Sequence, residues 1–263
     1  MRKMMRIAAG LAVFLMAAGA FCQGIPGYLR VSGTEITGCD KDRLPANLVI
    51  PEGITKIGPY VFSDCTSLKS VTIPASVKTV GYGAFTGCEN IKTVQYRGTL
   101  AQWCQMDNTS YYENTTITLS DVPDLRALKT LVIPASVRTI GYEAFMDCTA
   151  LESVTIPAGV TKIGGFAFEN CTSLKSVTIP ETVTEIGTQA FDRCSLESVT
   201  IPSSVRTMGG GAFSCMNLKT VKYNGTKAQW RKISINGTTA DPWAFWDSVT
   251  VHCTDGNIPA NQD

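Results

Sequence analysis

The sequence predicts a solenoid, in which short repeats stack so that each coil adds one strand to a parallel β-sheet. Three observations lead to this expectation: a recurring Ile-Pro pair, an alternation of apolar and polar residues before it, and a glycine followed by Ala-Phe after it. A single repeat of this kind cannot bury its own apolar face, so neighbouring repeats must stack to form a continuous core. The Ile-Pro pairs begin at Ile50, Ile73, Ile133, Ile156, Ile179 and Ile201, at steps of 23, 60, 23, 23 and 22 residues.

The strand of each repeat precedes its proline. In the unit 68–88, Val71 and Ile73 alternate with polar neighbours, as a short half-buried strand requires. Pro74 has no backbone N–H for a β-ladder, so the strand ends there. We therefore expect about eight parallel strands, at 48–50, 71–73, 94–96, 131–133, 154–156, 177–179, 199–201 and 221–223.

The second half of each repeat forms turns. Gly81 follows a β-branched residue, and we expect it to adopt a positive φ, which glycine tolerates best. Phe85 then points into the interior of the coil, and Cys88 closes the unit as a small buried residue.

Six of the ten cysteines share this closing position. We expect them to form a buried column of free thiols, because stacked side chains on coils about 4.8 Å apart keep their Cβ atoms farther apart than a disulfide prefers. The four cysteines outside the column, Cys22, Cys39, Cys104 and Cys253, are the better candidates for any disulfide. The predicted column comprises Cys65, Cys88, Cys148, Cys171, Cys194 and Cys215.

Two matching segments interrupt the repeat, and each ends in a tryptophan. In 96–103 and 223–230, a tyrosine replaces the isoleucine of Ile-Pro and a tryptophan follows seven residues later. These segments predict two arrays, each closed by a Trp-containing cap. The expected organisation is a signal peptide at 1–20, an N-terminal segment at 21–44, a first array with its cap at 45–103, a projecting loop and connector at 104–126, a second array at 127–223, and a C-terminal cap and tail at 224–263.

The N-terminus predicts export. Three basic residues precede the apolar stretch 7–18, which is too short to span a bilayer, and Ala18-Gly19-Ala20 fits a signal-peptidase site. An uncleaved anchor is the alternative. Cys22 allows a lipid anchor, although Phe21 is a poor residue before an acylated cysteine. We expect an exported protein, on the cell surface, in the periplasm or secreted, with no transmembrane span after cleavage.

Nothing in the sequence indicates catalysis. His252 is the only histidine and the cysteines form no C-x-x-C pair, so we expect neither a metal site nor a Ser-His-Asp triad. The glycine clusters lack the Lys-Ser/Thr of a phosphate-binding loop. The net charge is +1 with no basic block, which argues against nucleic acid. We expect no enzyme and no cofactor.

Binding is the more informative possibility. An outward row along the predicted sheet is rich in hydroxyl groups, and the loop within 104–126 contains adjacent tyrosines, a residue type common in binding hot spots. A solvated β-face is the alternative reading of the row. Trp243 and Trp246 fit the interior of the second cap better than a binding role. The candidate partner-binding residues are Thr72, Gln95, Thr155, Thr178, Thr200, Lys222, Tyr111 and Tyr112.

The repeat resembles that of the BspA-like leucine-rich-repeat proteins, including the treponemal-type surface proteins. The pattern L-x-x-V-x-I-P-x-x-V-x-x-I-G-x-x-A-F-x-x-C is found at 68–88, 151–171 and 174–194 with small departures, and the last repeat is shortened. The resemblance implies a leucine-rich-repeat solenoid, surface exposure and adhesion to extracellular-matrix or cell-surface proteins. The alternative is a structural scaffold that self-associates without host adhesion.

Overall fold

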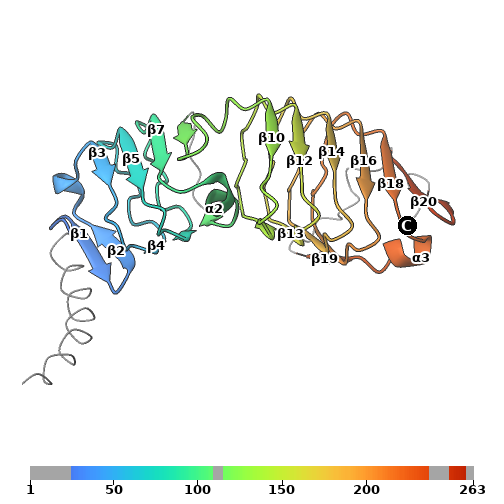
Figure 1. Ribbon diagram of the computed structural model, residues 1–263, viewed down its shortest axis with the longest axis horizontal. Helices are drawn as coiled ribbons and strands as arrows, with labels where there is room; N and C mark the ends of the chain where they lie inside the picture. Colours follow the sequence, from blue (N-terminus) through green and yellow to red (C-terminus); the bar gives the residue numbers. More distant parts are fainter. Residues whose placement is uncertain (1–24, 109–114, 237–248, 259–263) are drawn as a thin grey trace, which may run out of the picture.

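The protein is an elongated, gently bowed stack of coils (Figure 1). The computed structural model describes residues 25–108, 115–236 and 249–258. The predicted signal peptide, Cys22, the tyrosines at 111 and 112 and the tryptophans at 243 and 246 lie outside these residues.

One row of parallel strands runs along the stack as two sheets, which we call the front sheets (Figure 1). Each of the eight predicted strands overlaps one of these strands, with its bounds correct to within one residue, so their presence is confirmed. The first front sheet contains β3 (Asn47–Val49), β5 (Ser70–Ile73), β7 (Thr93–Tyr96) and β9 (Thr116–Thr118). The second contains β10 (Thr130–Val132), β12 (Ser153–Thr155), β14 (Ser176–Thr178), β16 (Ser198–Ile201), β18 (Thr220–Tyr223), β20 (Thr250–Cys253) and the antiparallel β21 (Gly256–Ile258).

A second row of strands, not predicted from the sequence, forms two rear sheets. Most of these strands have only two or three residues and lie just before the repeat glycine, where a β-branched residue or methionine fills the buried position. The first rear sheet contains β1 (Leu29–Ser32), β2 (Glu35–Cys39), β4 (Lys56–Ile57), β6 (Thr79–Val80) and β8 (Asp107–Asn108). The second contains β11 (Thr139–Ile140), β13 (Lys162–Ile163), β15 (Glu185–Ile186), β17 (Thr207–Gly209) and β19 (Ser234–Asn236). The short helices are η1 (Lys41–Arg43), α2 (Leu100–Cys104) and α3 (Lys227–Trp230).

The core lies between the front and rear sheets, and stacked phenylalanines line it. The rings of Phe145 and Phe168 lie 5.2 Å apart and nearly parallel, and those of Phe168 and Phe191 lie 5.1 Å apart. The backbone N–H of Phe145 donates to the carbonyl of Ala167 in the next coil, 2.8 Å away. Each Ala-Phe pair therefore contributes a ring to the core and a hydrogen bond between coils, which explains why the repeat retains it.

The repeat glycine is needed for close approach of the backbones, and its predicted positive φ is wrong. Positive φ falls two residues later, at Gly83 and at Tyr60 in the preceding coil. A Cβ at Gly81 would lie 2.6 Å from the backbone nitrogen of Pro59. Real Cβ atoms do not approach backbone so closely, so only glycine lets the coils stack here. The same contact with the previous coil's backbone, below 3.0 Å, recurs at Gly58, Gly141, Gly164, Gly187 and Gly209.

The described part of 104–126 is not a projecting loop. It contains β8 and β9, which continue the rear and front sheets of the first array. After β9 the chain turns back, and the N–H of Leu125 donates to the carbonyl of Ile117, 2.8 Å away. The sequence hides these strands because they lack the Ile-Pro pair, whereas backbone hydrogen bonds to the preceding coil do not require it.

The predicted column of thiols is divided into two parts, one in each array. The first part begins one coil earlier than expected. Cys88 donates to the carbonyl of Phe62 at 2.9 Å, and Cys171 donates to that of Phe145 at 3.3 Å. Cys39, predicted to lie outside the column, heads it, because its thiol interacts with that of Cys65; it also donates to the carbonyl of Val61 at 3.1 Å. All nine cysteines within the described part of the chain are free thiols, including Cys39, Cys104 and Cys253.

Candidate functional site

The two front sheets place one predicted set of side chains in a row along each sheet, and the two rows together are here called the front row. Parallel pairing brings Thr155 opposite Thr178 and Thr178 opposite Thr200, one residue per coil. Neighbouring residues in each strand point inward, so the row faces away from the core. In chain order the front row is Val49, Thr72, Gln95, Thr118, Val132, Thr155, Thr178, Thr200, Lys222 and His252.

All six strand residues predicted as binding candidates lie in the front row. Thr72 is half-buried, and the other five are exposed. The structure adds Thr118 and His252, which the sequence could not assign because their strands lie outside the repeat period. The remaining candidates, Tyr111 and Tyr112, lie outside the described residues.

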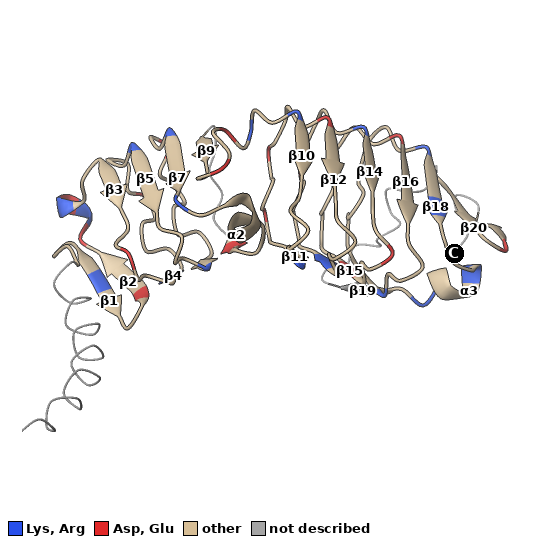
Figure 2. Cartoon of the chain, viewed as in Figure 1, with Lys and Arg blue, Asp and Glu red and all other residues tan. Residues whose placement is uncertain are grey.

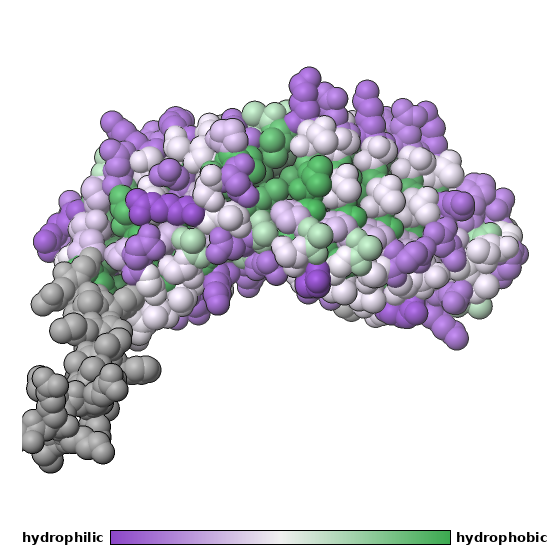
Figure 3. Space-filling view, viewed as in Figure 1, coloured by the Kyte–Doolittle hydropathy of each residue, from purple (hydrophilic) through white to green (hydrophobic). Residues whose placement is uncertain are grey.

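The front row contains little charge and a few apolar positions. Figure 2 shows that charged residues gather at turns and strand ends, whereas the front strands are almost uncharged, with Lys222 in β18 as the exception. Val132 is 63% exposed, a high value for an apolar side chain in the middle of a strand. Apolar side chains gather around β9 and β10, where the two front sheets meet (Figure 3). An uncharged surface with an apolar centre suits contact with another protein.

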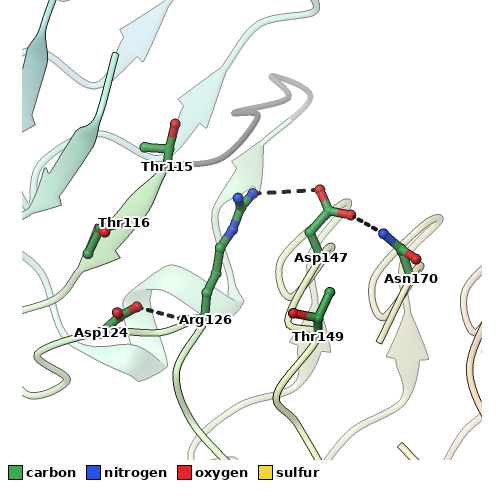
Figure 4. Close-up of a pocket in the computed structure, with 7 residues that line it drawn as sticks. All are labelled: Thr115, Thr116, Asp124, Arg126, Asp147, Thr149 and Asn170. Atoms are coloured by element: carbon green, nitrogen blue, oxygen red, sulfur yellow. Dashed lines mark hydrogen bonds and ion pairs between the residues drawn. The ribbon is translucent and has the colours of Figure 1, made fainter. Parts of the chain in front are cut away.

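A polar cavity of about 380 Å³ opens where the two arrays join (Figure 4). The guanidinium of Arg126 points into it, 3.8 Å from Asp147, and the amide of Asn170 donates to the same carboxylate at 2.7 Å. The Asp124 carboxylate accepts the backbone N–H of Arg126 at 3.0 Å. The other lining residues are Thr115, Thr116 and Thr149. Sequence reasoning missed this cavity because its walls come from the connector and two separate coils. Its hydroxyls and charges suit a hydrogen-bonding group.

The tryptophans of the two interrupting segments are both buried. Trp103 contacts Tyr96, with ring centroids 5.6 Å apart, and Trp230 contacts Tyr223 at 5.1 Å. Each short helix begins with a threonine capping box, which fixes its first turn. Trp103 does not close a free end, because its indole N–H donates to Ala144 in the second array.

In the part of the chain that the structure describes, no group of three or more His, Cys, Asp or Glu residues is arranged to hold a metal ion. Over the same residues, none of the helices has the length and apolar character that crossing a membrane requires.

A comparison with protein families identifies the repeat. A family model described as "BspA type Leucine rich repeat region" matches in six copies, over residues 43–149 and 124–240. A comparison with curated proteins gave no match.

Solved structures similar to the chain include bacterial leucine-rich-repeat proteins. A leucine-rich-repeat protein of Treponema pallidum is 24% identical, with a TM-score of 0.34, over 76% of this chain and 85% of that one. A leucine-rich cell surface protein of Faecalibacterium prausnitzii is 21% identical, with a TM-score of 0.26, over 81% and 98%. The pneumococcal vaccine antigen PcpA is 12% identical, with a TM-score of 0.39, over 89% and 84%.

Proposed function

The chain belongs to the BspA-type leucine-rich-repeat family, and from this premise we propose that it is an exported binding protein without catalytic activity. Its partner is an extracellular-matrix or cell-surface protein, and it binds that partner through the front row. The observation that carries this proposal is the unbroken register of exposed, mostly uncharged side chains along each front sheet.

The physical case rests on shape and desolvation. A sheet with one strand per coil is rigid, so its side chains lose little freedom when they are covered. Threonine and glutamine side chains hydrogen-bond without the large desolvation cost of a charge, and Val132 gives the centre an apolar contact. Tyr111 and Tyr112 remain proposed contributors to the same interface.

Binding of the mature protein to immobilised extracellular-matrix proteins tests this interface. Thr178→Lys places a long charged side chain in the middle of the row and should weaken binding at least tenfold. Thr184→Lys is the matched control, because Thr184 is an exposed threonine of the same coil that lies beside the rear sheet. If both variants bind as the wild type does, the front row is not the interface.

Export belongs to the same proposal. The basic residues and the apolar stretch at 7–18 support a signal peptide cut after Ala20, with Cys22 as the position of any lipid anchor. The location is the cell surface, the periplasm or the medium. Protease added to intact cells should degrade the protein if it is on the surface, whereas protection until the outer membrane is opened would place it in the periplasm.

A structural scaffold is the second candidate. End-to-end association requires a coil end that is not covered. The buried Trp230 supports a C-terminal cap over 224–263, so in this scaffold the caps or the opposite end of the stack would form the contacts. Sedimentation distinguishes the two functions. A stable oligomer that binds no matrix protein would favour the scaffold, and a monomer that binds would favour adhesion.

A further inference from the structure

A line of aromatic side chains lies on the turns that follow the rear strands, away from the front row. We call Tyr60, Tyr82, Tyr142 and Phe166 the aromatic ledge. The rings of Tyr60 and Tyr82 meet edge to face at 5.6 Å, and those of Tyr142 and Phe166 meet at 5.2 Å. Tyr60 is 54% exposed and Tyr82 is 63% exposed. Tyr60 and Tyr82 belong to the first array and Tyr142 and Phe166 to the second, so the ledge has one pair on each side of the join between the arrays.

The repeat geometry does not require aromatic residues at these positions. Tyr60 and Phe166 have φ values of 54° and 57°, and the same repeat position is occupied by glycine at 83 and 211. A left-handed backbone disfavours large side chains by about 1–2 kcal/mol relative to glycine. Packing within the coil therefore does not explain why aromatic side chains occupy these positions.

Beside Tyr142 lies a carboxyl group without a compensating cation. Glu143 occupies the same repeat position as Tyr60, and its Oε2 is buried with no hydrogen-bond partner within the described chain. The neighbouring carboxylates are paired: Glu169 lies 3.7 Å from Arg193, and Asp147 lies 3.8 Å from Arg126. Among the described residues, Glu143 takes part in none of the ion pairs.

The environment of Glu143 is consistent with a missing positive charge. Burial raises the pKa of its carboxyl to about 7, and Glu169 and Asp147 raise it further because they are negative. A cation brought to this point would offset both effects. Tyrosine rings attract cations over their faces as well, through the ring quadrupole.

We propose that the aromatic ledge, together with Glu143 beside Tyr142, binds an extended segment of a protein partner through Arg or Lys side chains. The guanidinium or ammonium group reaches Glu143, and the aliphatic stems of these side chains lie against the tyrosine rings. The neighbouring coils of a parallel stack lie about 4.8 Å apart, so the ledge follows several residues of extended chain. A small free cation would contact only one or two coils.

Fluorescence anisotropy with a labelled nonapeptide of alternating Gly and Arg tests the proposal at pH 8. The mature protein should bind this peptide at least tenfold more tightly than the same peptide with Gln in place of Arg. Binding should weaken as salt is added, because screening reduces attraction between exposed charges. Equal affinity for both peptides would overturn the proposal.

Two variants identify the surface. Tyr82→Ala and Glu143→Gln should each weaken binding of the Arg peptide by about three- to tenfold. Met216→Ala and Glu152→Gln are the matched controls, because Met216 is an exposed apolar side chain and Glu152 an exposed carboxylate in other parts of the coil. A melting temperature at least as high as that of the wild type shows that a variant is folded. Equal losses in variants and controls, or no loss in either variant, would contradict the assignment.

Competition with spermidine distinguishes the source of the cation. If the ledge binds an extended chain, displacing the labelled peptide should need far higher concentrations of spermidine than of the unlabelled peptide. Displacement at equal concentrations would assign the surface to small polyamines and overturn the proposal. Thr178→Lys should leave Arg-peptide binding unchanged, so failure of the front-row interface and failure of the ledge are measured independently.

Discussion

The indole N–H of Trp103 donates to the carbonyl of Ala144, with 2.7 Å between nitrogen and oxygen. In a regular coil the carbonyl of the corresponding alanine accepts from the backbone N–H of the preceding phenylalanine, as in the bond from Phe145 to Ala167. The carbonyl of Cys104 likewise accepts from the N–H of Gly141 at 2.6 Å, as the isoleucine carbonyl does between regular coils. Helix α2 therefore replaces a repeat turn and joins the arrays.

Trp103→Ala should both destabilise the protein and uncouple its arrays. Removing a fully buried tryptophan from a core costs about 3–5 kcal/mol, and here it also removes the hydrogen bond to Ala144. Stability in a solenoid depends on the interfaces between neighbouring coils. Urea unfolding followed by circular dichroism should therefore change from one transition to two.

Two variants serve as controls for this effect. Trp103→Phe keeps a ring in the core but loses the N–H donor, so it should cost less and keep one transition. Trp230→Ala removes a comparably buried ring after the last full coil, and it should lower stability without separating the arrays. Two transitions with Trp230→Ala, or one with Trp103→Ala, would show that Trp103 is not the coupling residue.

The buried thiols should resist modification until the protein unfolds. Burial raises the pKa of Cys65 and of Cys148 to about 12, so neither is a thiolate at neutral pH. In a Cys22→Ser background, native protein should react quickly with a thiol reagent only at the partly exposed Cys253. Nine thiols should react in denaturant without reductant. A lower number in denaturant would reveal a disulfide.

The sequence predicted the features that recur within each repeat, and it missed those that depend on contacts between neighbouring coils. The front strands could be predicted from the alternation of apolar and polar residues, because this pattern lies within a single repeat. Most rear strands are only two or three residues long and depend on pairing with the next coil, so no single repeat reveals them. The front row was predictable for Thr72 to Lys222, while Thr118 and His252 lie in strands without the Ile-Pro signal.

The repeat glycine should be irreplaceable for steric reasons. A Cβ at Gly187 would lie 2.3 Å from the backbone nitrogen of Gly165, and backbone in a stacked coil cannot move away easily. Gly187→Ala should therefore lower the free energy of unfolding by several kcal/mol, as overpacking against backbone does. Chemical denaturation measures this loss.

The position two residues later should behave in the opposite way. Gln189 has a φ of 51°, a conformation that disfavours side chains by about 1–2 kcal/mol relative to glycine. Gln189→Gly relieves this cost, while the flexible unfolded chain offsets about 0.5–1 kcal/mol of the gain. The variant also loses the hydrogen bond from the Gln189 amide to the Asp192 carboxylate at 2.9 Å, worth about 0.5–1.5 kcal/mol. The net effect should therefore stay within about 1 kcal/mol of zero. If Gln189→Gly were strongly destabilised while Gly187→Ala kept the stability of the wild type, the assignment of the two positions would be reversed.

Glu143 should make stability fall between about pH 4.5 and pH 7. Its folded pKa is raised to about 7 from 4.5, chiefly by burial. Below pH 4.5 the carboxyl is protonated in both states and costs nothing. Between the two values the unfolded chain releases a proton that the folded chain keeps, so the unfolded state is favoured as pH rises. Above pH 7 the cost is complete, at roughly 2–3 kcal/mol.

Glu143→Gln removes this titration and should be more stable than the wild type at pH 8 but not at pH 4. Denaturant melts at five pH values between 4 and 8 measure the difference, which should grow with pH and level off above 7. Glu152→Gln is the control, because that carboxylate is exposed and 3.3 Å from Lys129; its effect should stay below about 1 kcal/mol throughout. A difference between Glu143→Gln and wild type that is constant over this range would mean that a nearby cation compensates Glu143 in the folded protein, and the ledge would then lack the charge that selects a basic partner.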